Sequence, residues 1–176
     1  PIAEDWHLGY TPLLKKYGTE MTDKEYLQKT PEIFDREEDL KLLQEALLKQ
    51  RGANVLLIGE PGVGRESLVI NLAKLLHTNK SHPLLADFRI IKLSLTTVLS
   101  RYSDRLKSLN FLKELLEEAE KARNIILYIP DLPVYLNPKS NINIKPILKE
   151  FLHSPFMHII GLATPFEYEI IINPQT

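Results

Sequence analysis

The fold is decided by one stretch of the sequence, which reads Val55-Leu56-Leu57-Ile58-Gly59-Glu60-Pro61-Gly62-Val63-Gly64-Arg65-Glu66-Ser67. Its first four residues are apolar and of strand length, and leucines recur at helical spacing in residues 65–77. The glycines between these two patterns let backbone N–H groups converge, and the start of the following helix adds its dipole. The stretch therefore predicts a strand, a turn that cradles phosphates, and a helix.

Apolar runs of strand length recur along the chain, and segments with helical apolar spacing separate them. The runs are 55–58, 88–95, 125–129 and 158–163, and the helical segments are 36–50, 65–77, 105–122 and 144–152. Continuous apolar strands that alternate with amphipathic helices are typical of a parallel sheet covered on both faces. The sequence thus predicts an α/β fold of the P-loop NTPase class, with helices on both faces of a parallel sheet. The alternative interpretation is that the glycines only form a tight turn.

The composition is that of an ordinary globular domain, with 22 basic and 23 acidic side chains and no cysteine among 176 residues. Cysteine-based metal sites, thiol catalysis and disulfides are therefore excluded. A net charge of −1 gives no electrostatic footprint for nucleic acid or an anionic membrane, so we expect neither as a partner. No apolar stretch reaches the ~20 residues of a membrane span and no secretory leader is present, which favours the cytoplasm. Because the chain begins at Pro1 without a methionine, we expect it to be cut from a larger protein.

The phosphate-binding pattern continues with Lys and Ser or Thr, where this chain has Arg65 and Glu66. Arginine keeps the positive charge but is a longer, planar fork. A carboxylate at residue 66 faces the triphosphate, and two like charges about 4 Å apart cost about 4 kcal/mol at an effective dielectric near 20. Rotation of Glu66 into solvent, or its own coordination of Mg²⁺, would relieve part of that cost. Ser67 is turned ~100° around the helix and is a poor replacement hydroxyl.

The strand at 125–129 gives a second test of ATPase chemistry. ATPases of this class end the strand with an Asp that supports Mg²⁺, and one group follows it with a Glu that positions the attacking water. Here Pro130 stands in the place of the Asp, and Asp131 falls at the place of the Glu. Two interpretations stay open: Asp131 is a catalytic residue that orients water, or it is a turn residue at the strand end. The five histidines show no metal-ligand spacing, so no metal held by the protein alone is predicted.

Several stretches carry a resemblance to a known family. Residues 14–22 read LKKYGTEMT, residues 33–37 read IFDRE, and residues 160–164 read IGLAT. The first is similar to a Leu-x-Lys-Tyr-Gly lead-in that ends in Asp-Leu-Thr, and the second to an entry helix with Gly-Arg-Asp/Glu after two apolar residues. Together with the glycine stretch 59–64, they resemble the first ATPase module of the Clp-type AAA+ unfoldases, of the ClpB and ClpC kind. The resemblance covers residues 13 to about 170.

The resemblance implies an ATP-driven hexameric machine that threads polypeptide. Its cofactor would be ATP or ADP with Mg²⁺, and its partners would be neighbouring protomers, a protein substrate and, in a protease-regulating protein, a peptidase. The family's pore loop falls on residues 103–106, with Tyr102 two places before the aromatic that grips substrate. Thr164 takes the sensor-1 position, a catalytic role. The implied nucleotide-binding residues are Gly59, Glu60, Pro61, Gly62, Val63, Gly64, Arg65, Glu66 and Ser67, with Ile33 and Phe34 as adenine contacts.

The resemblance also divides the chain. We expect residues 1–32 to form an arm or linker that packs on the domain, and residues 33–176 to form the AAA+ large subdomain, cut before the arginine finger and the helical lid. Three interpretations stay open: a slow ATPase, a degenerate module that binds nucleotide weakly and hydrolyses almost none, and an assembly module without nucleotide. The departures from the Walker motifs favour the second. A DNA-remodelling AAA+ protein is the alternative from another class.

Overall fold

The computed structural model describes residues 9–31 and 36–172 of the chain, the last of them by its backbone alone. The elements follow in the order α2 (Pro12–Tyr17), β1 (Thr19–Glu20), α3 (Lys24–Gln28), α4 (Glu37–Leu47), β2 (Val55–Ile58), α5 (Arg65–His77), η1 (Pro83–Leu85), β3 (Arg89–Lys92), α6 (Leu95–Leu99), α7 (Arg105–Ala122), β4 (Ile125–Ile129), α8 (Leu132–Leu136), α9 (Lys145–Phe151), β5 (His158–Ala163), α10 (Pro165–Glu167) and η2 (Tyr168–Ile172). Within the described ranges, none of the helices combines the length and the apolar character that a membrane span requires.

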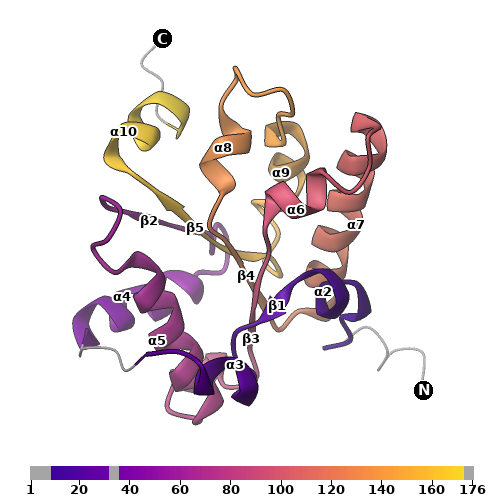
Figure 1. Cartoon of the computed structure of the whole chain (residues 1–176). Helices are drawn as coiled ribbons and strands as arrows, with labels where there is room; N and C mark the ends of the chain where they lie inside the picture. The colour runs from indigo at the N-terminus through magenta and orange to yellow at the C-terminus, as the bar shows by residue number, and fades with distance from the viewer. Residues whose placement is uncertain (1–8, 32–35, 173–176) are drawn as a thin grey trace.

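The described strands form one sheet of five, in the spatial order β1-β3-β4-β5-β2 (Figure 1). β2, β3, β4 and β5 are parallel, and the short β1 pairs antiparallel with β3. Because the four parallel strands run in one direction, the loops that follow them gather at one edge of the sheet. That edge, at the carboxyl ends of the strands, is where α/β proteins of this kind bind ligands.

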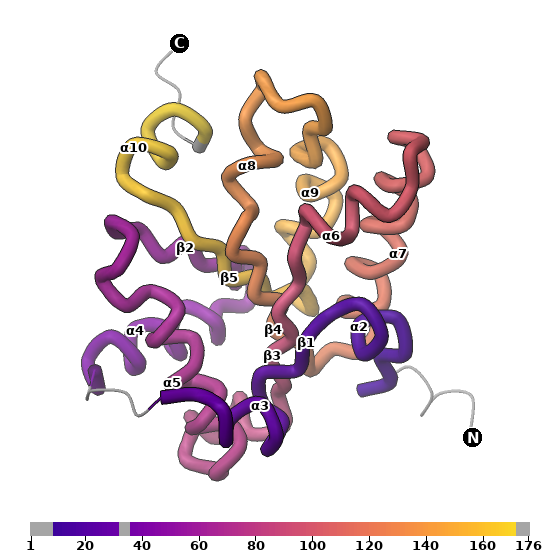
Figure 2. The backbone as a smooth tube through the Cα atoms, viewed as in Figure 1, coloured from indigo at the N-terminus to yellow at the C-terminus, as the bar shows by residue number. Residues whose placement is uncertain are grey.

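Helices cover both faces of the sheet, because successive strand side chains point to opposite sides. On one face Ile90 and Ile126 pack with apolar residues of α4 and α5. On the other face Ile91 and Leu127 pack with α6, α7, α8 and α9. Figure 2 traces the two layers, with α4 and α5 on one side of the sheet and α6, α7 and α9 on the other. The predicted α/β fold, a parallel sheet with helices on both faces, is confirmed, and the short antiparallel strand β1 adds to it.

The boundary after β3 differs from the prediction. The apolar run predicts one strand over 88–95, whereas β3 ends at Lys92 and α6 begins at Leu95. The Ser94 hydroxyl accepts a hydrogen bond from the Thr97 N–H at 3.3 Å, so Ser94 caps a helix instead of extending the strand. The helix predicted over 36–50 is also shorter, because α4 begins at Glu37 and ends at Leu47.

Residues 9–31, which belong to the predicted arm, contribute a strand and two short helices to the domain. β1 extends the sheet beside β3. At the start of α2, the backbone N–H groups of Leu13 and Leu14 donate to the carboxylate of Glu118 on α7, at 3.0 and 2.7 Å. This segment therefore packs against both the sheet edge and α7. The boundary between arm and domain stays a prediction, because residues 32–35 lie outside the described part of the chain.

Candidate functional site

The glycine loop, residues 59–64, joins β2 to α5 and has the geometry of a phosphate cradle. Gly62 and Gly64 have φ values of +90° and +84°, a conformation that residues with a Cβ rarely adopt. Gly64 is the N-cap of α5, so the unpaired N–H groups of the first helical turn face the loop. A Cβ on Gly62 would meet nothing within 4 Å, so the loop is open there. A glycine turn at an open helix start is the arrangement that binds phosphate in proteins.

Arg36, just before α4, forms a hydrogen bond to the last residue of the glycine loop. Its Nη1 donates to the Gly64 carbonyl at 2.6 Å, and its Nε and Nη2 donate to the Asp39 carboxylate at 3.1 and 3.0 Å. The side chain thus ties the loop to α4. This contact could not be predicted from the sequence, because a bond to a backbone carbonyl leaves no signature in the residue types of the loop.

A cavity of about 310 Å³ lies beside the glycine loop, between the loop, α4 and β2. Val63 and Arg65 line it from the loop side, and the side chains from α4 and β2 are mainly apolar. An apolar pocket with a few polar groups next to a phosphate cradle is the usual form of a nucleotide site. Ile33 and Phe34, the predicted adenine contacts, lie outside the described residues.

Glu66, in the first turn of α5, directs its carboxylate at the sheet. The Tyr128 hydroxyl donates to Oε2 at 2.6 Å, and the Lys92 ammonium donates to Oε1 at 3.2 Å and to Oε2 at 3.4 Å. Burial, followed by the hydrogen bond to Glu66, raises the pKa of Tyr128 far above its usual range, so the phenol stays protonated and donates. The sequence analysis expected this carboxylate to face the triphosphate, or to be relieved by solvent or Mg²⁺. The structure instead pairs it with Lys92 and Tyr128.

The surroundings of Glu66 do not fit the Mg²⁺ site of an ATPase. That site uses a hydroxyl in the first turn of the helix and a carboxylate at the strand end. Here both oxygens of Glu66 are engaged by Lys92 and Tyr128, and Pro130 supplies no carboxylate. Over residues 9–31 and 36–172, no group of three or more His, Cys, Asp or Glu side chains is placed to hold a metal. Residues 66 and 130 therefore lack the hydroxyl and the carboxylate that this class of site uses to support Mg²⁺.

Asp131 follows β4 and uses its carboxylate to cap α6. Oδ1 accepts a hydrogen bond from the Leu95 N–H at 3.0 Å, and Oδ2 accepts from the N–H and the hydroxyl of Thr96, each at 2.9 Å. These bonds tie the end of β4 to the segment after β3. A role for Asp131 in orienting water stays a prediction.

Thr164 follows β5, next to the glycine loop. The Gly59 N–H, at the start of the loop, donates to the Ala163 carbonyl at 3.0 Å. Thr164 is the next residue after Ala163, so it lies close to the start of the loop. The Thr164 hydroxyl accepts from the Glu167 N–H at 3.0 Å, and the Glu167 carboxylate accepts from the Thr164 N–H at 2.8 Å. This capping box fixes α10. The structure thus brings Thr164 to the site edge, and its sensor role stays a prediction.

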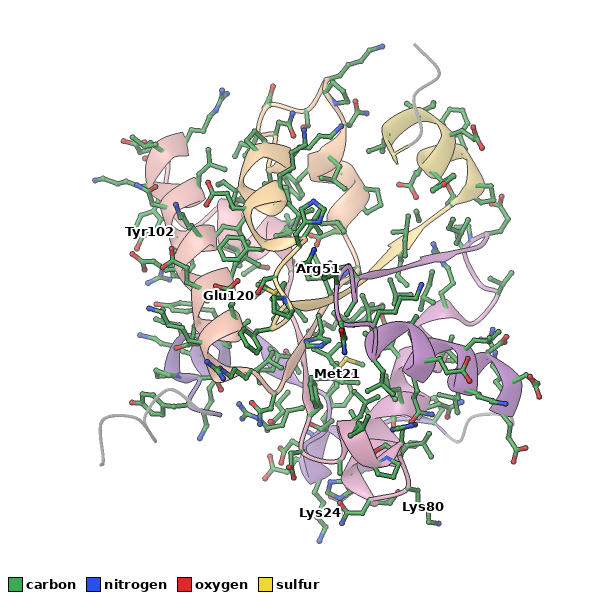
Figure 3. All side chains as sticks on the ribbon, turned by 180° about the vertical axis from the view of Figure 1, so that it is seen from behind. Met21, Lys24, Arg51, Lys80, Tyr102 and Glu120 are labelled. Atoms are coloured by element: carbon green, nitrogen blue, oxygen red, sulfur yellow. The ribbon has the colours of Figure 1, made fainter. Side chains whose placement is uncertain are left out.

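The predicted pore loop, residues 103–106, spans the end of the α6–α7 connection and the first two residues of α7. The Asp104 carboxylate caps α7 by accepting from two N–H groups of its first turn, at 2.8 and 3.3 Å. Tyr102 is 40% exposed, and its ring packs edge-on against Phe111 with a centroid distance of 5.8 Å. Figure 3 shows Tyr102 beside α7 at the rim of the molecule. A substrate-gripping role for this segment stays a prediction.

The sequence analysis missed Lys92 and Tyr128, although both carry a signal. Tyr128 is the polar-tipped side chain in an otherwise apolar strand, and Lys92 follows two isoleucines at the end of its strand. They are direct register partners in neighbouring parallel strands, and they reach the same carboxylate. Because the carboxyl ends of parallel strands share an edge with the glycine loop, a lysine at the end of a buried strand indicates a partner for Glu66.

The fold and the site together define a class of protein. A glycine loop between the edge strand β2 and α5, at the carboxyl edge of a parallel sheet with helices on both faces, is the arrangement of a P-loop nucleotide-binding domain. No model of a known protein family matches the chain. Curated proteins match it along most of its length.

The chain is 28% identical to the chaperone protein ClpB of Wolinella succinogenes, over 88% of this chain and 18% of the relative. It is 30% identical to ClpB of Rickettsia conorii, over 91% of this chain and 19% of the relative. Among solved structures, the Hsp104–ADP complex of S. cerevisiae superposes with a TM-score of 0.79 at 25% identity, over 90% of this chain and 28% of that one. The chain is thus a Clp-type AAA+ module, as the resemblance predicts. It spans about a fifth of the length of these curated relatives.

Proposed function

We propose that this chain is the nucleotide-binding module of a Clp-type, ATP-dependent unfoldase or protease regulatory subunit, and that it binds ATP or ADP weakly and hydrolyses almost none. The observation that carries the proposal is the open glycine loop at the start of α5, with left-handed glycines at residues 62 and 64. A similar protein, yeast Hsp104, was solved as an ADP complex, which supports a nucleotide as the ligand.

In this proposal the nucleotide lies across the glycine loop. The backbone N–H groups of Gly62, Gly64 and the first turn of α5, together with the dipole of that helix, hold the phosphates, and Arg65 adds a positive charge. The base enters the cavity beside Val63, with Ile33 and Phe34 as the proposed adenine contacts. The apolar lining that α4 and β2 give this cavity supports the placement.

Hydrolysis is slow in this proposal because the groups that drive phosphoryl transfer are weakened. That reaction depends on a metal ion at the phosphates and on a positioned water. Glu66 and Pro130 replace the two residues that support the metal, and the carboxylate of Asp131 already accepts three hydrogen bonds. The nucleotide then acts mainly as a structural ligand.

The module's proposed role is assembly of a hexameric ring with neighbouring protomers, in the cytoplasm. A polypeptide substrate is the second proposed partner, and a peptidase the third where the larger protein regulates a protease. A structure of yeast Hsp104 with casein, which superposes with a TM-score of 0.76, supports the polypeptide. The near-neutral charge of the chain favours neither nucleic acid nor a membrane as a partner.

A nucleotide-independent assembly module is the second candidate function. The Glu66–Lys92–Tyr128 cluster favours this second candidate, because the cluster holds α5 on the sheet without any ligand. The two candidates differ in one property, which is whether phosphate groups bind the glycine loop. A DNA-remodelling protein would need a basic surface, which a net charge of −1 does not provide.

A titration with a fluorescent ADP analogue and with ATP tests the proposal. We expect dissociation constants weaker than about 1 μM, little effect of Mg²⁺, and almost no phosphate release. Gly62→Val should abolish binding, because the added side chain fills the open loop. Gly52→Val is the matched control, since Gly52 also has a positive φ, of +65°, and also has nothing within 4 Å of an added Cβ.

Two results of this titration would contradict the proposal. Submicromolar binding that tightens strongly with Mg²⁺ would show an intact ATPase site. A complete absence of binding at millimolar nucleotide would select the nucleotide-independent assembly module instead.

A further inference from the structure

Three elements bring a carboxylate, an ammonium and a phenol together beside the first turn of α5. Glu66 lies in the first turn of α5, Lys92 ends β3, and Tyr128 lies in β4. Lys92 and Tyr128 are register partners in neighbouring strands, so both side chains leave the sheet on the face that α5 covers. The position of each group is therefore set by the sheet and the helix together, and not by a surface loop.

The contacts in this cluster engage both carboxylate oxygens of Glu66, and the one to Tyr128 is short. The Lys92 ammonium is 3.2 Å from Oε1 and 3.4 Å from Oε2, and the Tyr128 hydroxyl is 2.6 Å from Oε2. The ammonium also lies 5.8 Å from the centroid of the Tyr128 ring. The side chains of Lys92 and Glu66 are 32% and 41% exposed, so the pair borders solvent at the loop.

Charge balance explains what the pair does for an anion. An unpaired carboxylate at the start of α5 would repel a phosphate bound in the glycine loop. Lys92 cancels that charge from the sheet side, at 3.2 Å from Glu66, the residue that stands where an ATPase has the hydroxyl that ligates its metal ion. A fixed ammonium there both neutralises Glu66 and opposes the entry of a divalent cation.

We infer that Lys92 takes the place of the divalent cation at this site, so that the glycine loop binds nucleoside di- and triphosphates free of metal. This inference rests on the proposed function, since it requires that nucleotide binds at all. The inference also names what controls binding. The charge balance between Lys92 and Glu66, and not Mg²⁺, sets the affinity of the loop for phosphate.

The test is a charge cycle read by binding of a fluorescent ADP analogue to the whole chain, in buffer with MgCl₂ and in buffer with EDTA. The wild-type dissociation constant should agree within about twofold between the two buffers. Lys92→Met should weaken binding about tenfold by leaving Glu66 unpaired, and Glu66→Gln should tighten it several-fold by freeing the ammonium. The double variant should return close to wild type, because the two charges act as one unit.

Lys80→Met is the matched control. Lys80 follows the C-terminus of α5, at the opposite end of that helix from the glycine loop, and Figure 3 labels it there. The Lys80→Met substitution also removes one lysine charge, but at the other end of α5, and should leave the affinity for the ADP analogue unchanged. Circular dichroism of each variant separates lost binding from lost structure, and if Lys92→Met fails to fold, the tightening by Glu66→Gln still tests the inference.

Each outcome separates the inference from the proposed function. Wild-type binding that stays weaker than about 1 μM but requires Mg²⁺ overturns the inference and leaves weak nucleotide binding, the core of the proposed function, standing. Metal-independent binding that neither Lys92→Met nor Glu66→Gln alters also overturns it, because the pair then has no part in affinity. If the wild-type chain binds no nucleotide in either buffer, the proposed function is wrong and the inference falls with it.

Discussion

Restoring the metal site by Arg65→Lys, Glu66→Thr and Pro130→Asp together is expected to tighten binding of Mg²⁺–ATP by about a hundredfold or more. Lysine supplies a compact ammonium for the phosphates, and threonine supplies the hydroxyl that ligates Mg²⁺. Aspartate at residue 130 supplies the supporting carboxylate. Because the three positions serve one site, the triple variant should gain more than the sum of the single changes.

Lys92 sets a limit on that gain, which the structure alone reveals. In the triple variant its ammonium has lost Glu66, its partner at 3.2 Å, and opposes the metal ion. Adding Lys92→Ala should therefore tighten Mg²⁺–ATP binding further and make it depend on Mg²⁺. Calorimetric titration with Mg²⁺ or EDTA measures both effects. If Glu66→Thr alone gives the whole gain, the roles assigned to Arg65 and Pro130 are wrong.

A large loss of stability is expected at Gly18, where Gly18→Ala should lower the free energy of unfolding by about 3 kcal/mol. An added Cβ would lie 2.6 Å from Cγ2 of Ile91, 2.9 Å from the Leu14 carbonyl oxygen and 3.1 Å from the Lys92 carbonyl oxygen. Two of these neighbours are backbone atoms, which cannot rotate away. The methyl group would therefore push α2 from β3, and the segment 9–31 would lose part of its contact with the sheet.

Gly52→Ala is the control for this experiment. Gly52 has a φ of +65° but no neighbour within 4 Å of an added Cβ, so only backbone strain of about 1 kcal/mol is expected. Gly18 has the opposite character, with an ordinary φ of −112° and no free space. Urea unfolding of the two variants compares the effects. Equal losses would show that the close packing of residues 9–31 on the sheet does not stabilise the domain.

The bounds of several elements could be predicted to the residue. This holds where one apolar pattern covers one element and no more. The strands β2, β4 and β5 and the helices α5 and α7 agree with the predicted ranges because each is an unbroken apolar run or a leucine stripe. The prediction failed after Lys92, where apolar residues continue through a strand end into α6. Only the Ser94 cap separates the two, and its hydrogen bond depends on the backbone already having turned.

The candidate site likewise has one part that the sequence predicts and one part that it does not. Glycine at residues 59, 62 and 64 indicates a phosphate loop from spacing alone, since the loop is local in sequence. The partners of Glu66 could not be read from spacing, because Lys92 and Tyr128 lie 26 and 62 residues away and meet it only through the strand order and register. The departure at Glu66 is therefore visible in the sequence, whereas the two side chains that compensate its charge are not.

A crystal structure of this chain grown with ADP and MgCl₂ tests the central claim most directly, which is that the glycine loop holds phosphate in a site without a metal. We predict that the diphosphate accepts hydrogen bonds from the N–H groups of the loop and that the Glu66 carboxylate still accepts from Lys92 and Tyr128. We predict no metal ion between the diphosphate and Glu66. A Mg²⁺ ion ligated by Glu66 and the diphosphate, or a glycine loop without nucleotide at saturating ADP, would contradict the account.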